Sequence, residues 1–354
     1  MIAMEVNGDG ANQEIQRCLV QSDSPSAGGS YFPRAWLPIA ETAVEFAGGR
    51  HVVMYWPEIE PVGKAFMAIE VRPFDTALGA EIRGVDLSRP LSGEDAKAIH
   101  AAWMEHLVLL FRGQTLSDPQ LIAFSRHFGD LEFPPTKLLK LKKGIEQKSD
   151  IPPEINVISN VKENGKPIGQ LGAGEAAWHT DSGFVDEPPN ASILYAIEIP
   201  ANAGNTSFLN MYAAYETLAD DLKARIEGRR AKHDPSYTSV GVRRADFDEV
   251  TDVSRSPGPL HPIVRTHPET GRKALYLGRR LNSYVEGLPV SESEELLDKI
   301  WAHTVQPRFV WEHHWQVGDV VMWDNRCAMH RREAFDDSMR RILHRTQLKG
   351  DRPF

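Results

Sequence analysis

Residues 177–184 read AWHTDSGF, which places an imidazole and a carboxylate two positions apart, at His179 and Asp181. Side chains alternate faces along a strand, so in a strand these two point the same way while Thr180 points the other. A histidine and an acid that converge on one point form half of a metal site. By itself the pattern is weak evidence, because His-x-Asp occurs by chance in many proteins.

A third donor follows a predicted strand much later in the chain. The segment GDVVMWDNRCAMHR, residues 318–331, supplies His330. Two histidines and one carboxylate on one side of an iron ion form the facial triad of non-haem Fe(II) oxygenases, with positions left open for a co-substrate and O2. Catalytic zinc accepts the same donors, so a zinc-dependent hydrolase stays open at this point.

The segment MRRILHRTQLKGD, residues 339–351, supplies candidates for binding an anionic co-substrate. On a strand, Arg341 and Arg345 share a face, so both guanidinium groups would enter one cavity. Arginine binds a carboxylate with two hydrogen bonds, and two arginines inside an acidic protein indicate anionic ligands. The alternative is an exposed strand whose arginines pair with Asp336 and Asp337.

Short strand-like segments separated by Gly or Pro predict the fold class. They include NASILYAIEIP, NTSFLNM, RFVWEHHWQ, DVVMWDN and RRILHRTQL. We expect a mainly β protein with flanking helices, built on a barrel or a double-sheet jelly roll. Helices are expected after capping serines, over residues 92–106, 117–129 and 291–304, the last with Ser291 and Glu294 as a capping box.

Composition limits the function classes. The chain has 354 residues, of which 41% are hydrophobic and 25% charged, as in an ordinary globular protein. The net charge of -9 argues against a general nucleic-acid or anionic-membrane binder. Cys18 and Cys327 are far apart and form no CxxC motif. With no apolar run of about 20 residues and no secretion signal, a cytoplasmic protein that does not enter membranes is expected.

The chain is expected to divide near residue 66. Residues 1–66 contain polar and Gly-rich runs, NGDGANQE and SDSPSAGGS, without a sustained period. We interpret them as an N-terminal extension of low order or an appended segment. Residues 67–354 form the expected functional domain.

Six blocks of sequence together resemble the TauD/TfdA family of Fe(II)/2-oxoglutarate-dependent dioxygenases, which includes taurine and 2,4-dichlorophenoxyacetate dioxygenases. The blocks are LGAEIRGVDLSRPL, WHTDSGF, GNTSFLNMYAAYETL, LHPIVRTHPETGRKALYL, VMWDNRCAMHR and RRILHRTQLKGD, in the order of the family. The resemblance runs from about Met67 to the C-terminus. It implies a double-stranded β-helix, or jelly roll, with the metal at its open end.

The resemblance also implies the roles of individual residues. Arg341 matches the arginine that binds the distal carboxylate of 2-oxoglutarate, and Thr206 matches a threonine that hydrogen-bonds the same co-substrate. Arg345 matches the arginine that contacts an acidic group of the primary substrate. Related halogenases lack the carboxylate ligand, so its presence here implies hydroxylation, with release of succinate and CO2. The implied iron ligands are His179, Asp181 and His330.

Substrate positions depart from the taurine enzymes. Lys137 and Pro134 stand where those enzymes have a tyrosine and a histidine, and Glu175 replaces an asparagine. Arg279 stands where family members line the substrate pocket, beside Arg280, which we expect to face solvent. The expected substrate is therefore a small organic acid, a carboxylate or sulfonate other than taurine.

Two alternative functions use the same residues. A zinc-dependent hydrolase with the same triad would not explain the presence of Arg341 and Thr206. A non-enzymatic jelly roll that binds an organic acid would not need an open metal position. By analogy with related enzymes, the chain is expected to form a homo-oligomer, a dimer or a tetramer.

Overall fold

The computed structural model describes residues 69–133 and 151–354 in full and the backbone of residues 39–46 and 50–57. The chain divides into two units, Met1–Phe66 and Met67–Phe354. In the first unit, β1 (Ile39–Phe46) and β2 (Arg50–Pro57) pair as an antiparallel hairpin, which the sequence analysis did not predict. The interpretation of residues 1–66 as an appended segment stays a prediction.

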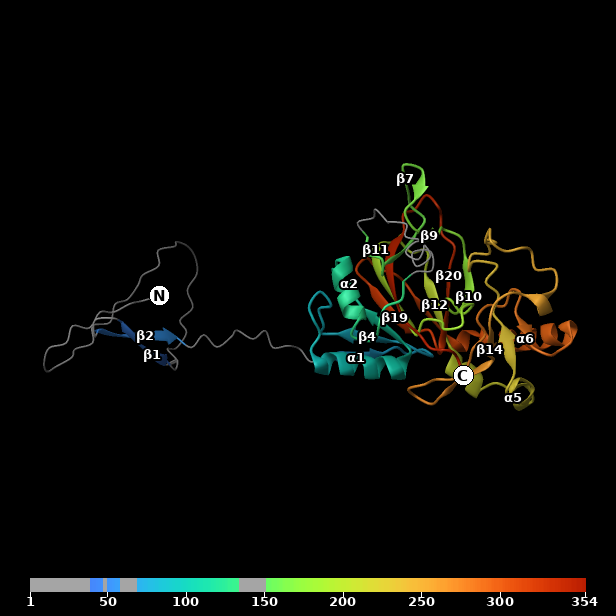
Figure 1. Ribbon diagram of the computed structural model, residues 1–354, viewed down its shortest axis with the longest axis horizontal. Coiled ribbons are helices and arrows are strands. Elements are labelled where there is room, and N and C mark those ends of the chain that lie inside the picture. The colour runs from blue at the N-terminus through green and yellow to red at the C-terminus, as the bar shows by residue number, and fades with distance from the viewer. Residues whose placement is uncertain (1–38, 47–49, 58–68, 134–150) are drawn as a thin grey trace. The chain divides into compact units, whose positions relative to one another are not determined.

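The second unit is built on two sheets (Figure 1). The larger sheet has eight strands, in the order β3-β4-β5-β19-β11-β21-β6-β9, and the smaller has four, in the order β10-β20-β12-β18. Most neighbouring strands are antiparallel, and β4–β5 and β6–β9 are parallel. This arrangement confirms the predicted fold class, mainly β with a jelly-roll core.

The strands of the larger sheet are β3 (Glu70–Pro73), β4 (Ala80–Arg83), β5 (Val108–Phe111), β6 (Asn156–Ser159), β9 (Gln170–Leu171), β11 (Ala191–Glu198), β19 (Val320–Asp324) and β21 (Ile342–Leu348). Those of the smaller sheet are β10 (Ala176–His179), β12 (Thr206–Asn210), β18 (Val310–His313) and β20 (Ala328–Arg332).

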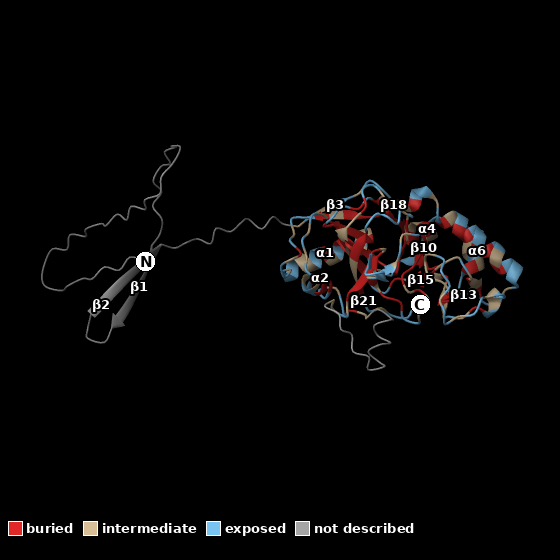
Figure 2. Ribbon diagram, turned by 90° about the horizontal axis from the view of Figure 1, so that it is seen from above, coloured by how far each residue is buried: buried red, intermediate tan, exposed pale blue. Residues whose placement is uncertain are grey.

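The central strands of the larger sheet are buried on both faces, because their side chains alternate between two separate cores. On β19, Val321 and Trp323 join the core that also contains residues of the smaller sheet, such as Phe208. Val320 and Met322 instead join a core on the other face, with residues of two helices. Figure 2 shows these strands as the most deeply buried part of the domain.

Those two helices are α1 (Gly93–His106) and α2 (Asp118–Ser125), which lie on one flank of the domain in both views (Figures 1 and 2). Ser92 caps α1 by accepting a hydrogen bond from the backbone N–H of Asp95, and Ser117 forms a capping box with Gln120. Both predicted helix starts are thus confirmed. The second helix ends at Ser125, before the predicted end at residue 129.

The capping box predicted for the last helix is wrong. Helix α6 (Val290–Thr304) begins one residue before Ser291, so Ser291 lies inside the first turn and cannot cap it. Glu294, the other member of the predicted box, instead forms an ion pair with Arg280, with a 2.6 Å distance between Nη2 and Oε2. Helix α6 therefore anchors Arg280, whose side chain is 29% exposed, through this ion pair.

The remaining elements lie mainly on the flank opposite α1 and α2 (Figure 1). A three-stranded sheet has the order β14-β13-β17, and β15–β16 and β7–β8 form hairpins. Within residues 69–133 and 151–354, no helix combines the length and apolar run needed to cross a membrane. The bounds are β7 (Lys162–Glu163), β8 (Lys166–Pro167), α4 (Met211–Glu216), α5 (Asp220–Ile226), β13 (Arg230–Lys232), β14 (Leu260–Pro262), β15 (Val264–Thr266), β16 (Lys273–Leu275) and β17 (Tyr284–Val285).

Candidate active site

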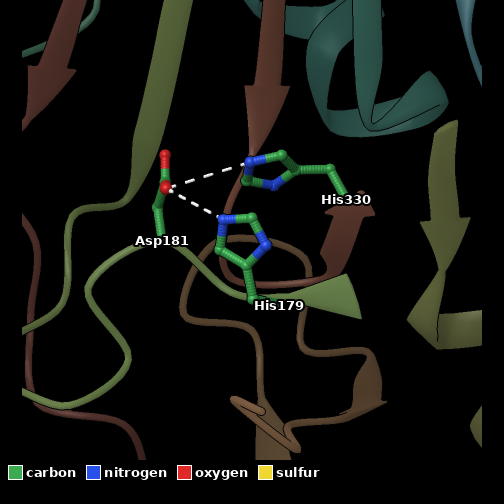
Figure 3. A group of neighbouring side chains, drawn as sticks. All are labelled: His179, Asp181 and His330. Atoms are coloured by element: carbon green, nitrogen blue, oxygen red, sulfur yellow. Dashed lines mark ion pairs between the residues drawn. The ribbon is translucent and has the colours of Figure 1, made fainter. Parts of the chain in front are cut away.

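Strand register brings the three predicted metal ligands together. In the pairing of β10 with β20, His179 lies directly opposite His330, and their ring centroids are 4.2 Å apart. Asp181 follows the end of β10 by two residues. Its Oδ1 lies 3.6 Å from Nε2 of His179 and 3.8 Å from Nε2 of His330 (Figure 3). One donor atom from each residue falls within 4.8 Å of the others, so the three could share one ion.

The Asp181 carboxylate is held in place by several donors. Nη1 of Arg345 lies 2.9 Å from Oδ2 and 3.1 Å from Oδ1, and the Ser192 hydroxyl donates to Oδ2 at 2.7 Å. Gln347 donates to both Asp181 and Ser192. The side-chain oxygen Oδ1 of Asn325 accepts a hydrogen bond from the backbone N–H of Asp181, which fixes the turn after β10. Hydrogen bonds of this kind orient ligand side chains and tune metal affinity.

The charges around Asp181 keep it ionised. Burial alone would raise the pKa of this carboxyl, but the guanidinium of Arg345, the largest opposing influence, holds the pKa well below its usual range. A buried anion with fixed orientation is the kind of oxygen donor that a divalent cation requires. The structure thus supports the carboxylate as a ligand at neutral pH.

The rings of the two histidines face the same point beside Asp181. Nδ1 of His179 donates to the carbonyl of Ala177 at 2.7 Å, which leaves the Nε2 lone pair free for a metal. Burial is the main cause that lowers the pKa of His330 to about 3. His330 is therefore neutral at pH 7. This set of two imidazoles and one carboxylate fits an Fe(II) ion.

A narrow cavity next to the triad contains the predicted co-substrate residues. Its lining includes His179, His330, Thr206 and Arg341. Arg341 is buried, and burial lowers the pKa of its guanidinium to about 9. Within the fully described residues, no carboxylate lies within ion-pair distance of it. An unpaired buried cation is costly, so this side chain is suited to an anionic ligand.

Neighbouring residues shape this end of the cavity. Trp315 donates its indole N–H to the hydroxyl of Thr206 at 2.9 Å, which leaves the hydroxyl hydrogen of Thr206 available for a ligand. Gly204 adopts φ +69°, and a Cβ there would come within 3.2 Å of Nε of Arg341. The glycine of the GNTSF block thus gives the Arg341 side chain room to pass.

A larger cavity of about 380 Å³ adjoins the triad and is a candidate site for the primary substrate. Its lining includes His179, Asp181, Arg244 and Arg279. Two rings, those of Phe184 and Phe247, also line it. The cavity therefore joins the metal ligands to a region with both positive charge and aromatic surface.

The two arginines of this cavity lack acidic partners. Within the described part of the chain, neither Arg244 nor Arg279 forms an ion pair; each donates to a backbone carbonyl, that of Pro235 and of Tyr237 respectively. Burial, and next the charge of Arg244, lower the pKa of Arg279 to about 10. Asp234 partly offsets this by favouring the charged form of Arg279, without an ion pair between them. Asp246 also lines the cavity, and Arg345 is paired with Asp181, so Arg244 and Arg279 together outweigh the one remaining acidic residue of the lining.

The other predicted substrate residues have different surroundings. Arg345 lines both cavities, but its guanidinium is already paired with Asp181. Glu175 is exposed and does not line either cavity, because a β-bulge between Ala176 and His179 turns Ala176, rather than Glu175, to the cavity side. Lys137, with Pro134, lies outside the described residues.

Sequence reasoning missed several residues of the site. Ser192 and Gln347 hold Asp181, and both sit at inward positions of neighbouring strands β11 and β21, where they are paired in register. Arg244 and Arg332 line the cavities from a loop and from β20. Only Arg332 had a local signal, since it lies two residues after His330 and shares its face of the strand.

A second buried group of possible metal ligands contains His267, Asp324 and Cys327. Here the Asp324 carboxylate is already paired with Arg326, at 2.7 Å between Oδ2 and Nη2, and accepts from Nε2 of His267 at 3.0 Å. Burial raises the pKa of the Cys327 thiol well above its usual value, which disfavours a thiolate ligand. This group is explained as a structural ion-pair network.

Comparisons with known proteins place the chain among dioxygenases. The family model described as "Taurine catabolism dioxygenase TauD, TfdA family" matches residues 70–347. An alpha-ketoglutarate-dependent 2,4-dichlorophenoxyacetate dioxygenase of Cupriavidus pinatubonensis is 37% identical over 80% of this chain and 99% of its own. An (S)-phenoxypropionate/alpha-ketoglutarate-dioxygenase of Sphingobium herbicidovorans is 33% identical over 80% of this chain and 96% of its own. The crystal structure of AAD-2 in complex with Mn(II) and N-oxalylglycine has a TM-score of 0.64 and 32% identity, covering 81% of this chain and 99% of that one.

Proposed function

The chain belongs to the TauD/TfdA family of dioxygenases, and on that premise we propose that it hydroxylates a small organic acid. The predicted cofactors, Fe(II), 2-oxoglutarate and O2, are confirmed at the level of the family by its alpha-ketoglutarate-dependent relatives. The products are succinate, CO2 and a hydroxylated acid.

We assign the metal to His179, Asp181 and His330, whose donors converge as Figure 3 shows. Bound iron would supply the activation of O2 that couples decarboxylation of 2-oxoglutarate to hydroxylation of a C–H bond. The chain itself orients the ligands: Ser192 and Arg345 fix the carboxylate, and a backbone carbonyl fixes the tautomer of His179. Arg341 and Thr206 bind and orient 2-oxoglutarate.

The observation that carries the substrate proposal is the unpaired positive charge in the larger cavity. Arg279 and Arg244 line this cavity beside Asp181 and have no ion-pair partner among the described residues. A carboxylate or sulfonate of the substrate would complete their hydrogen bonds. Phe184 and Phe247 provide apolar contact for an aromatic or aliphatic body, which then lies between the anionic end and the metal.

The relatives support an aryloxy acid as the first choice. Those compared above are named for 2,4-dichlorophenoxyacetate and (S)-phenoxypropionate, each a carboxylate joined to an aromatic ring. Hydroxylation of the carbon that bears the ether oxygen of such an acid yields a hemiacetal, which breaks down to a phenol and an oxo acid. The charge and aromatic lining of the cavity match both parts of these molecules.

Succinate release measured across phenoxyalkanoates, alkylsulfonates, sulfate esters, amines and neutral aryl ethers tests the proposal. We expect turnover of anionic compounds, with aryloxy acids leading. Arg279→Gln should raise KM for the acid by about 10- to 100-fold, since a charge-assisted hydrogen bond is lost. Arg280→Gln is the matched control, because Arg280 is paired with Glu294 and Asp298 at the surface. A preference for amines or neutral ethers would overturn the proposal.

Two alternative functions are separated by the same assays. A zinc-dependent hydrolase would consume no 2-oxoglutarate, and a binding protein would bind the acid without releasing succinate. The buried Arg341 and the open triad favour the oxygenase over both. The cytoplasmic location and the homo-oligomeric state stay predictions.

A further inference from the structure

A third arginine lines the narrow cavity beside the triad. Arg332 is the last residue of β20, two residues after His330, and the residue is only 6% exposed. Across the sheet it pairs in register with Thr206 on β12. It lines the cavity together with Arg341. Its position is thus next to the proposed 2-oxoglutarate residues and on the same side of the strand as the metal ligand.

Arg332 lacks an acidic partner. Its Nη2 donates to the backbone carbonyls of Leu171 and Gly174, and its Nε has no hydrogen-bond partner among the described residues. No carboxylate of the fully described residues lies within ion-pair distance. The guanidinium carbon is 5.3 Å from the centre of the Phe335 ring, and that of Arg341 is 5.9 Å from the same ring centre. Both cations therefore lie within reach of one aromatic side chain.

Two buried cations side by side repel each other. The charge of Arg332, added to burial, disfavours the charged form of Arg341. Burying one unpaired charge is already costly, and a second in the same cavity increases that cost. A dianionic ligand would remove the repulsion and complete the hydrogen bonds of both groups.

We propose that Arg332 and Arg341 together bind the distal carboxylate of 2-oxoglutarate, so that this end of the co-substrate is held by two guanidinium groups. The inference rests on the proposed function and adds to it a second cationic contact. It makes the site selective for dicarboxylic 2-oxo acids over monocarboxylic ones.

Binding of 2-oxo acids to the Mn(II)-loaded protein, measured by calorimetry, tests the assignment without turnover. The probes are 2-oxoglutarate and 2-oxobutyrate, which lacks the distal carboxylate. In Arg332→Gln we expect Kd for 2-oxoglutarate to rise about 10- to 100-fold, as for loss of a charge-assisted hydrogen bond, while Kd for 2-oxobutyrate changes less than about threefold. Arg332→Lys keeps the positive charge and is the variant most compatible with folding. Its Kd for 2-oxoglutarate should lie between that of the unsubstituted protein and that of Arg332→Gln.

Arg331→Gln is the matched control, because it removes the same charge from the opposite face of β20, where Arg331 stacks on Trp178. It should leave both dissociation constants unchanged. Equal losses for the two oxo acids in Arg332→Gln would show that Arg332 only ties down residues 171–174, and would overturn the proposal. Unchanged binding of 2-oxoglutarate would overturn it as well. If the unsubstituted protein binds no 2-oxoglutarate, the proposed function fails with it.

Discussion

Replacing Arg345 with methionine in the metal-free protein should lower the free energy of unfolding by about 3 kcal/mol, because it leaves the buried Asp181 carboxylate without its main cation. Nη1 of Arg345 lies 2.9 Å from Oδ2 of Asp181, and the two side chains are 13% and 7% exposed. Removing one partner of a buried pair costs about 3–5 kcal/mol, and the slight exposure of Arg345 favours the lower end. Asp181→Asn should cost a similar amount, since it leaves the guanidinium unpaired.

A double-mutant cycle measures whether the two residues act as a pair. The double variant removes both charges, so it should be more stable than the sum of the single losses predicts, by about 2–3 kcal/mol. Urea unfolding followed by tryptophan fluorescence at pH 7, in the presence of a chelator, gives the four free energies.

An exposed pair in the same domain provides the matched control for this cycle. Nε of Arg340 lies 2.6 Å from Oε2 of Glu198, with side chains 55% and 40% exposed. Its coupling should stay below about 1 kcal/mol, as for surface ion pairs in general. Additive losses at Arg345 and Asp181, within about 0.5 kcal/mol, would refute the view that Arg345 chiefly supports the metal ligand. Arg345 would then be free to contact substrate, as the sequence first indicated.

Three further outcomes follow from the structure. Burial lowers the pKa of His330 to about 3, so below about pH 6.5 the unfolded chain binds more protons than the folded chain, and stability falls as pH falls. Between pH 7 and pH 5 the free energy of unfolding of the metal-free protein should drop by about 2 kcal/mol more than that of His330→Gln. Equal drops for the two proteins, measured by urea unfolding at each pH, would contradict this. Gly278→Ala places a Cβ 2.2 Å from Nδ1 of His233 and should cost about 3 kcal/mol, against about 1 for Gly228→Ala, which has a similar φ and open space; equal losses on thermal unfolding would contradict the clash. Ser192→Ala should weaken Mn(II) binding by about tenfold in calorimetry, and an unchanged affinity would deny that the hydroxyl orients Asp181.

The metal ligands could be predicted because their signals are local. His179 and Asp181 stand two residues apart, and His330 follows a strand that its own apolar run predicts. The order of the motif blocks then supplied the family. The helix starts at Ser92 and Ser117 were likewise predictable, since capping depends on a few neighbouring residues.

The rest of the site depends on strand register, which no local pattern specifies. Ser192 and Gln347 contact Asp181 only because β11 pairs with β21 in one register. The β-bulge before His179 shifts the alternation of faces, so Glu175 could not be placed from spacing alone. Arg244 reaches the larger cavity from a loop, where no sequence period predicts which way a side chain points.

Anaerobic titration of Fe(II) into the protein with 2-oxoglutarate present, followed by metal analysis and a visible charge-transfer band, tests the central assignment most directly. We predict one iron per chain, a band that needs both iron and 2-oxoglutarate, and loss of iron in each of His179→Ala, Asp181→Ala and His330→Ala. An unsubstituted protein that binds no iron, or alanine variants that each retain it fully, would contradict the assignment.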